Sequence, residues 1–245
     1  MSSEIKDILN DQAKKINESH GTHLTNKLYQ IQISLMAFEK NYKDLEKSLV
    51  DYSNPHISSK LWELGHKERA RLYLWNVSRY LQNFLSSAST FRDHIRYLTQ
   101  KIFDKNEFIQ EYEDQILKRF SEDPLSNFIM KFRNNYLHTC VAATFASFDL
   151  DIANSKIYSE IYIDKNQLLD IYNEWNSKSK EYINSLTDKT PLLNIVKAYY
   201  EIVLNFYKWY EQRFFQIYKV EFEELDTLKK HYIYLQKSFF NKGSV

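Results

Sequence analysis

The side chains most suited to chemistry are gathered in one short run, RNNYLH at residues 133–138. A guanidinium group can hold a phosphate through two parallel hydrogen bonds, and an imidazole can accept or donate a proton near neutral pH. Because an ideal helix advances about 100° per residue, Asn134 and His138 fall within about 140° of Arg133, and the three share one side. The run is therefore the first candidate for a functional site.

The neighbours of Arg133 on the same predicted helix are mostly apolar. With Arg133 at zero, they spread over an arc from about 220° through zero to about 80°. The members of this arc are Phe128, Ile129, Met130, Phe132, Tyr136, Leu137, Cys140 and Val141. A charged group inside such an arc is unfavourable unless it is paired, reaches water along its own stem, or belongs to an interface or a site. This placement favours a functional role for Arg133.

The pattern Arg-Asn-x-x-x-His, formed by Arg133, Asn134 and His138, resembles the R-x4-6-H signature of the HEPN superfamily. The superfamily is named for higher eukaryotes and prokaryotes nucleotide-binding domains, and this chain resembles its prokaryotic ribonuclease-like members. A polar residue directly after the arginine is the usual form. The resemblance implies a helical bundle and covers about the first two-thirds of the chain, with a hairpin and the region after Asp164 as additions to the minimal bundle.

The resemblance also implies an activity, metal-independent cleavage of RNA. The ribose 2′-hydroxyl would attack the adjacent phosphate, with His138 as general base or acid. Arg133 would hold the scissile phosphate and stabilise the charge of the transition state, and Asn134 would bind the substrate by orienting the phosphate or the imidazole. The products would be a 2′,3′-cyclic phosphate and a 5′-hydroxyl. No metal or cofactor is expected.

The expected partners follow from the same resemblance. RNA is the substrate, and a homodimer would bring two copies of the motif together at a composite site. A role as a toxin or antiviral defence effector is implied by analogy, with an antitoxin or another regulatory protein as a further partner.

A different class of function also fits the residues. In this alternative the chain is a catalytically inactive helical module that binds nucleotides or another protein. Arg133 would then be a core arginine paired to an acid on a neighbouring helix, and His138 a surface histidine. A third hypothesis is an obligate partner-binding subunit that has no contact with RNA.

Other polar groups give weaker indications. His20 and His23 lack the cysteine or carboxylate that would complete a zinc site. Arg92 and Arg96 flank Asp93 on what we interpret as a solvated helix face, although both could contribute to an RNA groove. The glycines are too scattered to form a phosphate-binding loop, which excludes Walker-type and dinucleotide-binding sites.

The elements that must position these residues are mainly helices. Each proline follows a residue that can cap a helix, in Asn54-Pro55, Asp123-Pro124 and Thr190-Pro191, and Asp104 and Asp164 open two capping boxes. We expect a helix from Pro55 to about residue 102, with Gly65 inside it and a break at 86–89. A β-hairpin is expected at about 143–163, where the residues alternate with period two, and a long C-terminal helix at about 191–238, with a break near residue 219.

Composition limits the class of protein. Among 245 residues, 43% are hydrophobic and 16% aromatic, which favours a folded chain, and the presence of only 3 Gly and 3 Pro favours long helices. We therefore expect one mostly α domain over residues 1–245, a helical bundle with a small hairpin insertion. A net charge of +1 does not indicate a nucleic-acid partner, so RNA binding would require a local patch of basic residues. The single cysteine and the absence of an apolar run near ~18 residues favour a cytoplasmic protein without a membrane span.

Overall fold

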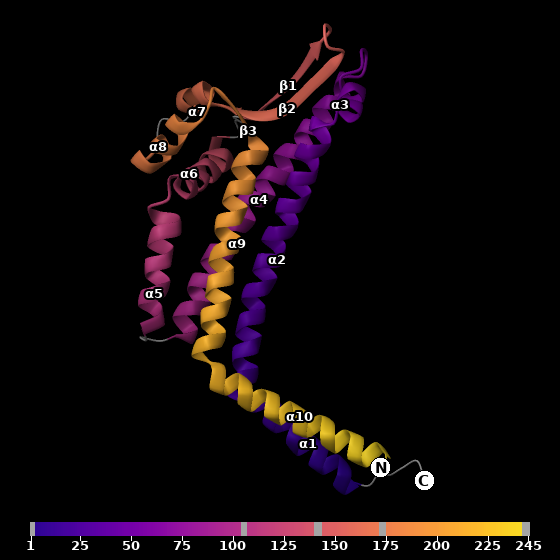
Figure 1. Cartoon of the computed structure of the whole chain (residues 1–245), viewed down its shortest axis with the longest axis vertical. Helices are drawn as coiled ribbons and strands as arrows, with labels where there is room; N and C mark the ends of the chain where they lie inside the picture. The colour runs from indigo at the N-terminus through magenta and orange to yellow at the C-terminus, as the bar shows by residue number, and fades with distance from the viewer. Residues whose placement is uncertain (1–2, 104–106, 140–143, 172–174, 242–245) are drawn as a thin grey trace. The chain divides into compact units, whose positions relative to one another are not determined.

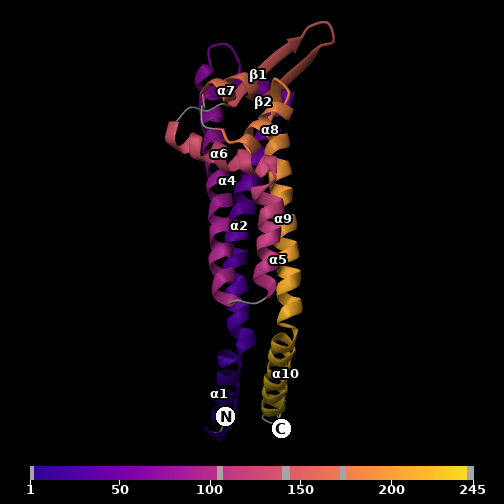
Figure 2. The same ribbon diagram turned by 90° about the vertical axis from the view of Figure 1, so that its left-hand side faces the viewer.

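The computed structural model describes residues 3–103, 107–139, 144–171 and 175–241, and at positions 3, 107, 137–139, 171, 240 and 241 it describes the backbone alone. The described chain is mostly helical, with one small antiparallel sheet (Figures 1 and 2). This confirms the expected mostly α bundle with a small β insertion. None of the described helices is both long enough and apolar enough to cross a membrane.

The elements follow one another along the chain in this order: α1 (Ser3–Glu18), α2 (His20–Ser53), α3 (Pro55–Leu61), α4 (Lys67–Ile102), α5 (Glu107–Ile116), the short π-helix η1 (Leu117–Ser121), α6 (Pro124–Thr139), β1 (Thr144–Asp151), β2 (Lys156–Asp164), α7 (Lys165–Ile171), α8 (Ser177–Ser185), β3 (Lys189–Pro191), α9 (Leu192–Ile217) and α10 (Lys219–Asn241).

The chain forms two compact units, which we describe separately. The terminal unit takes Met1–Ile33 and Tyr207–Val245, and the central unit takes Ser34–Phe206. The long helices α2 and α9 contribute residues to both. The expected single domain stays a prediction, because compactness alone does not decide whether two units unfold together.

The core of the central unit is aromatic and is shared by three long helices, α2, α4 and α9. Phe38 of α2 stacks on Phe84 of α4 with ring centroids 5.3 Å apart, and Tyr199 of α9 meets the Phe84 ring edge-on at 6.2 Å. All three side chains are buried. Burial of such large rings contributes apolar area and favourable ring geometry together, so these contacts hold the three helices side by side.

The β-hairpin is confirmed, with β1 paired to β2 from Thr144 opposite Ile163 to Asp151 opposite Lys156. A hairpin alone is marginally stable in water, so it needs support. Here the buried Ser159 Oγ lies 2.8 Å from the Tyr52 carbonyl oxygen and 2.8 Å from Ser58 Oγ. The hairpin is thereby fastened to the end of α2 and to α3.

The prediction that Thr190 caps a helix beginning at Pro191 is wrong in detail. Pro191 lies in a third strand, β3, opposite Tyr162 of β2, and α9 begins one residue later at Leu192. Proline cannot donate a ladder hydrogen bond, but an edge strand does not require every donor, so the sheet tolerates it there. The caps at Asn54 and Asp123 are confirmed, since Asn54 Oδ1 accepts from His56 N at 3.0 Å and Asp123 Oδ2 from Ser126 N at 2.7 Å.

The helix expected after Pro55 breaks in a different place. It ends at Leu61 and restarts at Lys67, while α4 continues through residues 86–89 without interruption. Gly65 lies in the connection with φ of +84°, a left-handed conformation that favours glycine. Serines 86, 87 and 89 fit the helix because Ser87 Oγ donates to the Phe84 carbonyl at 3.0 Å. Of the two capping boxes, Asp164 Oδ1 accepts from Gln167 N at 3.0 Å, and Asp104 lies outside the described residues.

The expected long C-terminal helix at 191–238 is two helices, α9 and α10, which meet at Tyr218. In a straight helix, Phe214 and Phe222 would be separated by about 12 Å of axial rise. Their ring centroids lie 6.1 Å apart, and Phe222 also reaches Phe215 at 4.9 Å. The break at Tyr218 allows this aromatic cluster to close within the terminal unit, and its position agrees with the break expected near residue 219.

The terminal unit contains a close approach between α2 and α10. A Cβ placed on Gly21 of α2 would lie 2.6 Å from the Glu221 carbonyl oxygen and 2.8 Å from Leu225 Cβ. Gly21 lies in the first turn of α2. Glycine is required there because no larger residue allows the two backbones to come so close.

Gly21→Ala should loosen α10. A gain of up to about 1 kcal/mol in helix propensity is outweighed by overpacking against a backbone carbonyl, which costs about 1–3 kcal/mol. Hydrogen–deuterium exchange of α10 peptides should therefore accelerate. Asn26→Ala, at an exposed position on the same helix, is the matched control and should leave α10 protection unchanged. Unchanged protection in Gly21→Ala would contradict the close approach.

Candidate functional site

Helix α6 carries the candidate residues and is anchored by aromatic burial. Phe128 and Phe132 are buried and stacked with ring centroids 5.4 Å apart. The Phe128 ring also stacks on Trp175 at 5.5 Å and packs against Tyr182 of α8 at 5.1 Å. Because a helix of this length is rigid, burial of the Phe128–Phe132 face determines which residues of α6 lie at its rim, meaning the edge between the buried face and solvent.

Arg133 and Asn134 lie at that rim. Arg133 is partly buried and Asn134 is exposed. The Arg133 guanidinium donates from Nη1 to Asn134 Oδ1 at 3.1 Å, while its Nε is buried and has no hydrogen-bond partner among the described residues. A buried donor without a partner is unfavourable by about 1–3 kcal/mol, and such groups are uncommon in native proteins. The guanidinium therefore retains hydrogen-bonding capacity that no described residue uses.

His138, the second catalytic candidate, belongs to α6 by its backbone, and its side chain lies outside the described residues. Position 138 is five residues after Arg133 on one continuous helix, which preserves the spacing that the sequence predicted. The structure thus brings Arg133 and Asn134 together through a hydrogen bond, and the relation of the imidazole to them stays a prediction.

Two identified hydrogen bonds join α6 to α4, and in one of them Arg92 Nη1 of α4 donates to Met130 Sδ of α6 at 3.2 Å. Tyr136 is partly buried, and its hydroxyl donates to the Ser78 carbonyl oxygen at 3.1 Å. The two helices are in contact in the central unit (Figures 1 and 2). Since Tyr136 follows Arg133 by one turn and Arg79 follows Ser78 directly, this bond brings two arginine-bearing segments to one helix crossing.

The arginines of the central unit differ in their carboxylate partners. Arg69 pairs with Glu63 at 3.2 Å, Arg71 lies 3.9 Å from Glu68, and both Arg92 and Arg96 contact Asp93, at 3.1 and 3.7 Å. Within the described part of the chain no carboxylate lies within 4.0 Å of three other arginines, which are Arg79, Arg119 and Arg133. The alternative in which Arg133 pairs with an acid on a neighbouring helix therefore finds no partner there.

Sequence reasoning did not single out Arg79. The signal that could have found it is the spacing of Arg71, Trp75 and Arg79, which lie four residues apart and so share one side of a helix. An aromatic residue flanked by two cations is unusual on a side that does not face the core. The pattern is visible only once the core side of α4 is known.

An open groove lies farther along α4, where α4, α5, η1 and α6 meet. It has a volume of about 800 Å³, and Arg92, Arg96, Glu113 and Asp114 contribute its charged lining. The expectation that Arg92 and Arg96 face solvent is met in part, because they line this groove and are held by Asp93. Two cations facing two carboxylates give the groove no net attraction for a phosphate.

Tyrosines of the groove are poor candidates for acid–base chemistry. Burial raises the pKa of Tyr112 well above its ordinary value, although Arg96 and Arg92 act in the opposite direction. Burial also raises the pKa of Tyr199 to about 12. Both phenols thus stay protonated near neutral pH and serve as packing groups in this wall.

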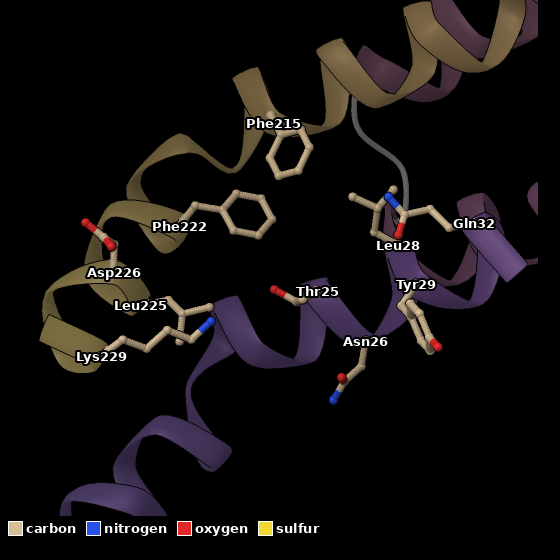
Figure 3. Close-up of a pocket in the computed structure, with 10 residues that line it drawn as sticks. All are labelled: Thr25, Asn26, Leu28, Tyr29, Gln32, Phe215, Phe222, Leu225, Asp226 and Lys229. Atoms are coloured by element: carbon tan, nitrogen blue, oxygen red, sulfur yellow. The ribbon is translucent and has the colours of Figure 1, made fainter. Parts of the chain in front are cut away.

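A second hollow, of about 360 Å³, lies in the terminal unit between α2, the end of α9 and α10 (Figure 3). Phe215, Phe222 and Leu225 point into it from α9 and α10. Its charged lining residues are Asp226 and Lys229, and Asp226 already accepts an ion pair from Lys230 at 2.6 Å. No histidine or cysteine is among its lining residues, and its one carboxylate is already paired, so the hollow is a weaker candidate for chemistry than the α6 segment.

A metal site is not formed by the described residues, in which no group of three or more histidine, cysteine or acidic side chains is clustered. His20, half of the weak zinc candidate, instead lies 3.9 Å from Glu221 and meets the Tyr218 ring edge-on. In comparisons with known proteins, no family model, no curated protein and no solved structure matches the chain. A functional assignment therefore has to come from the chain's own residues.

Tyr136→Phe should destabilise the chain by about 1 kcal/mol, because it removes the hydrogen bond to the Ser78 carbonyl. Urea unfolding followed by circular dichroism would measure this loss. Tyr158→Phe removes the hydroxyl of an exposed tyrosine on β2 and is the matched control, with no loss expected. Equal stability of the two variants would show that the Tyr136 hydroxyl does not hold α6 to α4.

Alkaline pH should unfold the central unit through its buried phenols. Burial raises the pKa of Tyr182 and of Tyr199 to about 12, from 10.0 for an exposed tyrosine. The unfolded chain then ionises first, so stability is fully present below pH 10.0 and is lost as the pH rises through about 12. The urea midpoint should fall as the pH rises through this window. A midpoint that does not change across the window would contradict the prediction.

Proposed function

We propose that the chain is a metal-independent endoribonuclease of the HEPN type, acting on RNA through Arg133, Asn134 and His138. The observation that carries this proposal is the partly buried guanidinium of Arg133, which has a buried Nε without a partner and no carboxylate partner among the described residues. An arginine whose charge is not neutralised within the chain is suited to bind a phosphate bidentately.

In the proposed reaction, the ribose 2′-oxygen forms a bond to the adjacent phosphorus while the bond from phosphorus to the 5′-oxygen breaks. His138 removes the proton of the 2′-hydroxyl or protonates the departing 5′-oxygen. Arg133 stabilises the charge that develops on the nonbridging oxygens, and the Asn134 amide orients the phosphate. The products are a 2′,3′-cyclic phosphate and a 5′-hydroxyl.

A homodimer belongs to this proposal. One imidazole cannot act as base and as acid in the same step, so two copies of His138, one from each chain, would divide the two proton transfers between them. The biological role that suits this chemistry is that of a toxin or antiviral defence effector in the cytoplasm, controlled by an antitoxin or another regulatory protein.

The proposal predicts cleavage of labelled single-stranded RNA in the presence of EDTA. His138→Ala should slow cleavage by about 10²–10⁴-fold, because general acid–base catalysis is worth that much. Arg133→Ala should slow it by about 10²–10³-fold, as expected for loss of transition-state charge stabilisation. Arg133→Lys should restore little, since an ammonium group cannot reproduce the bidentate geometry. Mass spectrometry of the products should find the cyclic phosphate end.

Matched controls are available in the same unit. His66→Ala removes an exposed histidine before α4, and Arg69→Ala removes an exposed arginine that pairs with Glu63. Both should cleave at the wild-type rate. Equal cleavage by wild type and His138→Ala, or cleavage that requires a divalent metal, would overturn the assignment. RNA binding without cleavage by the wild-type protein would favour the catalytically inactive binding module instead.

A further inference from the structure

One side of α4 carries exposed side chains of a kind that is usually buried or paired. Trp75 is 62% exposed and Leu72 is 60% exposed. Arg71 and Arg79 stand one turn before and one turn after Trp75, and both are exposed. We refer to Arg71, Leu72, Trp75 and Arg79 as the α4 face.

The exposure of Trp75 sets it apart from two other tryptophans of the central unit. Trp175 is buried, and its Nε1 donates to the Leu168 carbonyl at 3.0 Å. Trp62 is 39% exposed, less than Trp75, and its Nε1 donates to the Tyr52 hydroxyl at 2.8 Å. No described residue forms a hydrogen bond or ring contact with Trp75. Its indole is therefore a free apolar surface with an unused donor, which is typical of a binding residue.

The charges beside Trp75 are weakly compensated. The Arg79 guanidinium lies over the Tyr80 ring, 4.5 Å from its centroid, and Nη2 reaches Asn76 Oδ1 only at 3.4 Å. Arg71 lies 3.9 Å from Glu68, and more than three-quarters of each side chain is exposed, so this pair contributes little. Both arginines are thus available to an anionic ligand on either side of the indole.

The α4 face borders the candidate catalytic segment. Ser78, which precedes Arg79, accepts the hydrogen bond from Tyr136, and Tyr136 lies one turn after Arg133 on α6. A strand of RNA whose phosphate is held by Arg133 would therefore continue over or beside this part of α4. The juxtaposition is within the central unit and depends only on the α4–α6 contact.

We propose that the α4 face is a platform for single-stranded RNA, on which one base stacks on Trp75 while Arg71 and Arg79 bind the flanking phosphates. Stacking on an exposed aromatic side chain combined with cationic contacts to the backbone is how proteins hold single strands without reading their sequence. This inference rests on the proposed function in taking RNA as the ligand, and it adds the residues that hold the strand away from the cleaved bond.

Charge favours RNA over a second copy of this chain as the occupant. In a twofold symmetric contact the same patch meets itself, which would place the arginines of two α4 faces against each other. The nearest acid, Glu68, is a single carboxylate for two guanidinium groups. A polyanion neutralises both arginines and leaves the indole to cover a base.

The test measures RNA binding in a His138→Ala background, so that the strand stays intact. Fluorescence anisotropy with a short labelled single-stranded RNA should show that Trp75→Ala raises Kd by about 5- to 100-fold. Trp75→Phe, which keeps a ring, should recover most of the affinity. Tyr97→Ala is the matched control, because Tyr97 is 55% exposed on the same helix with Lys101 over its ring, and it should not change Kd.

The salt dependence tests the arginines separately. Arg71→Ala and Arg79→Ala should each reduce the slope of log Kd against log salt by about 0.7, the value for one phosphate contact on a single strand. Arg69→Ala should leave the slope unchanged because Arg69 pairs with Glu63. Circular dichroism checks that each variant is folded.

Several outcomes would overturn the platform. One is equal Kd for Trp75→Ala and Tyr97→Ala, and another is a Trp75→Ala protein that changes from dimer to monomer in sedimentation, which would make the α4 face a protein interface. Failure of the proposed function is a separate result, because it is read from cleavage by the wild-type protein. RNA that binds through Trp75 and is not cleaved would support the platform and contradict the nuclease.

Discussion

The burial of the Phe128–Phe132 face of α6 is the constraint on which the candidate site depends. Phe132 is 1% exposed, so the helix cannot turn about its axis without losing that contact. With this face fixed, Arg133 must lie at the edge of the core, where its Nε is buried and its Nη1 donates to Asn134 Oδ1. The bonds from Tyr136 to the Ser78 carbonyl and from Arg92 to Met130 then hold α6 against α4. A rotation of α6 would therefore move Arg133 and Asn134 away from this edge of the core.

An arginine in this position has a cost that the rest of the unit must offset. A buried donor without a partner disfavours the folded state by about 1–3 kcal/mol, which is a large share of the 5–15 kcal/mol by which domains are stable. The aromatic stacks of Phe38 on Phe84 and of Phe128 on Trp175 contribute stabilising free energy that offsets this cost. The arrangement suits a binding site, because an acceptor that completes the hydrogen bonds of Arg133 would gain most where water is partly excluded.

Local rules predicted the elements better than the contacts between them. The Asp123 cap, the alternation in β1 and β2, and the break near residue 219 are each encoded by a few neighbouring residues. The third strand was missed because a proline after threonine is equally suited to a helix start and to an edge strand, and only pairing with Tyr162 decides between them. The sequence could place Arg133 in an apolar arc, but the absence of an acid beside it depends on which helices surround α6, and that is tertiary information.

The two arginine clusters of α4 show why the larger cavity is the weaker candidate for an RNA site. Arg92 and Arg96 line a groove of about 800 Å³, yet both lie within 4 Å of Asp93 and face two further acids. Arg79 is exposed, and among the described residues it has the Tyr80 ring and Asn76 as neighbours but no carboxylate within 4.0 Å. A flexible polyanion needs accessible cations and a surface for stacking more than it needs an enclosed volume. The distribution of carboxylates along α4, rather than the shape of the surface, therefore separates the end of the helix that suits RNA from the end that serves packing.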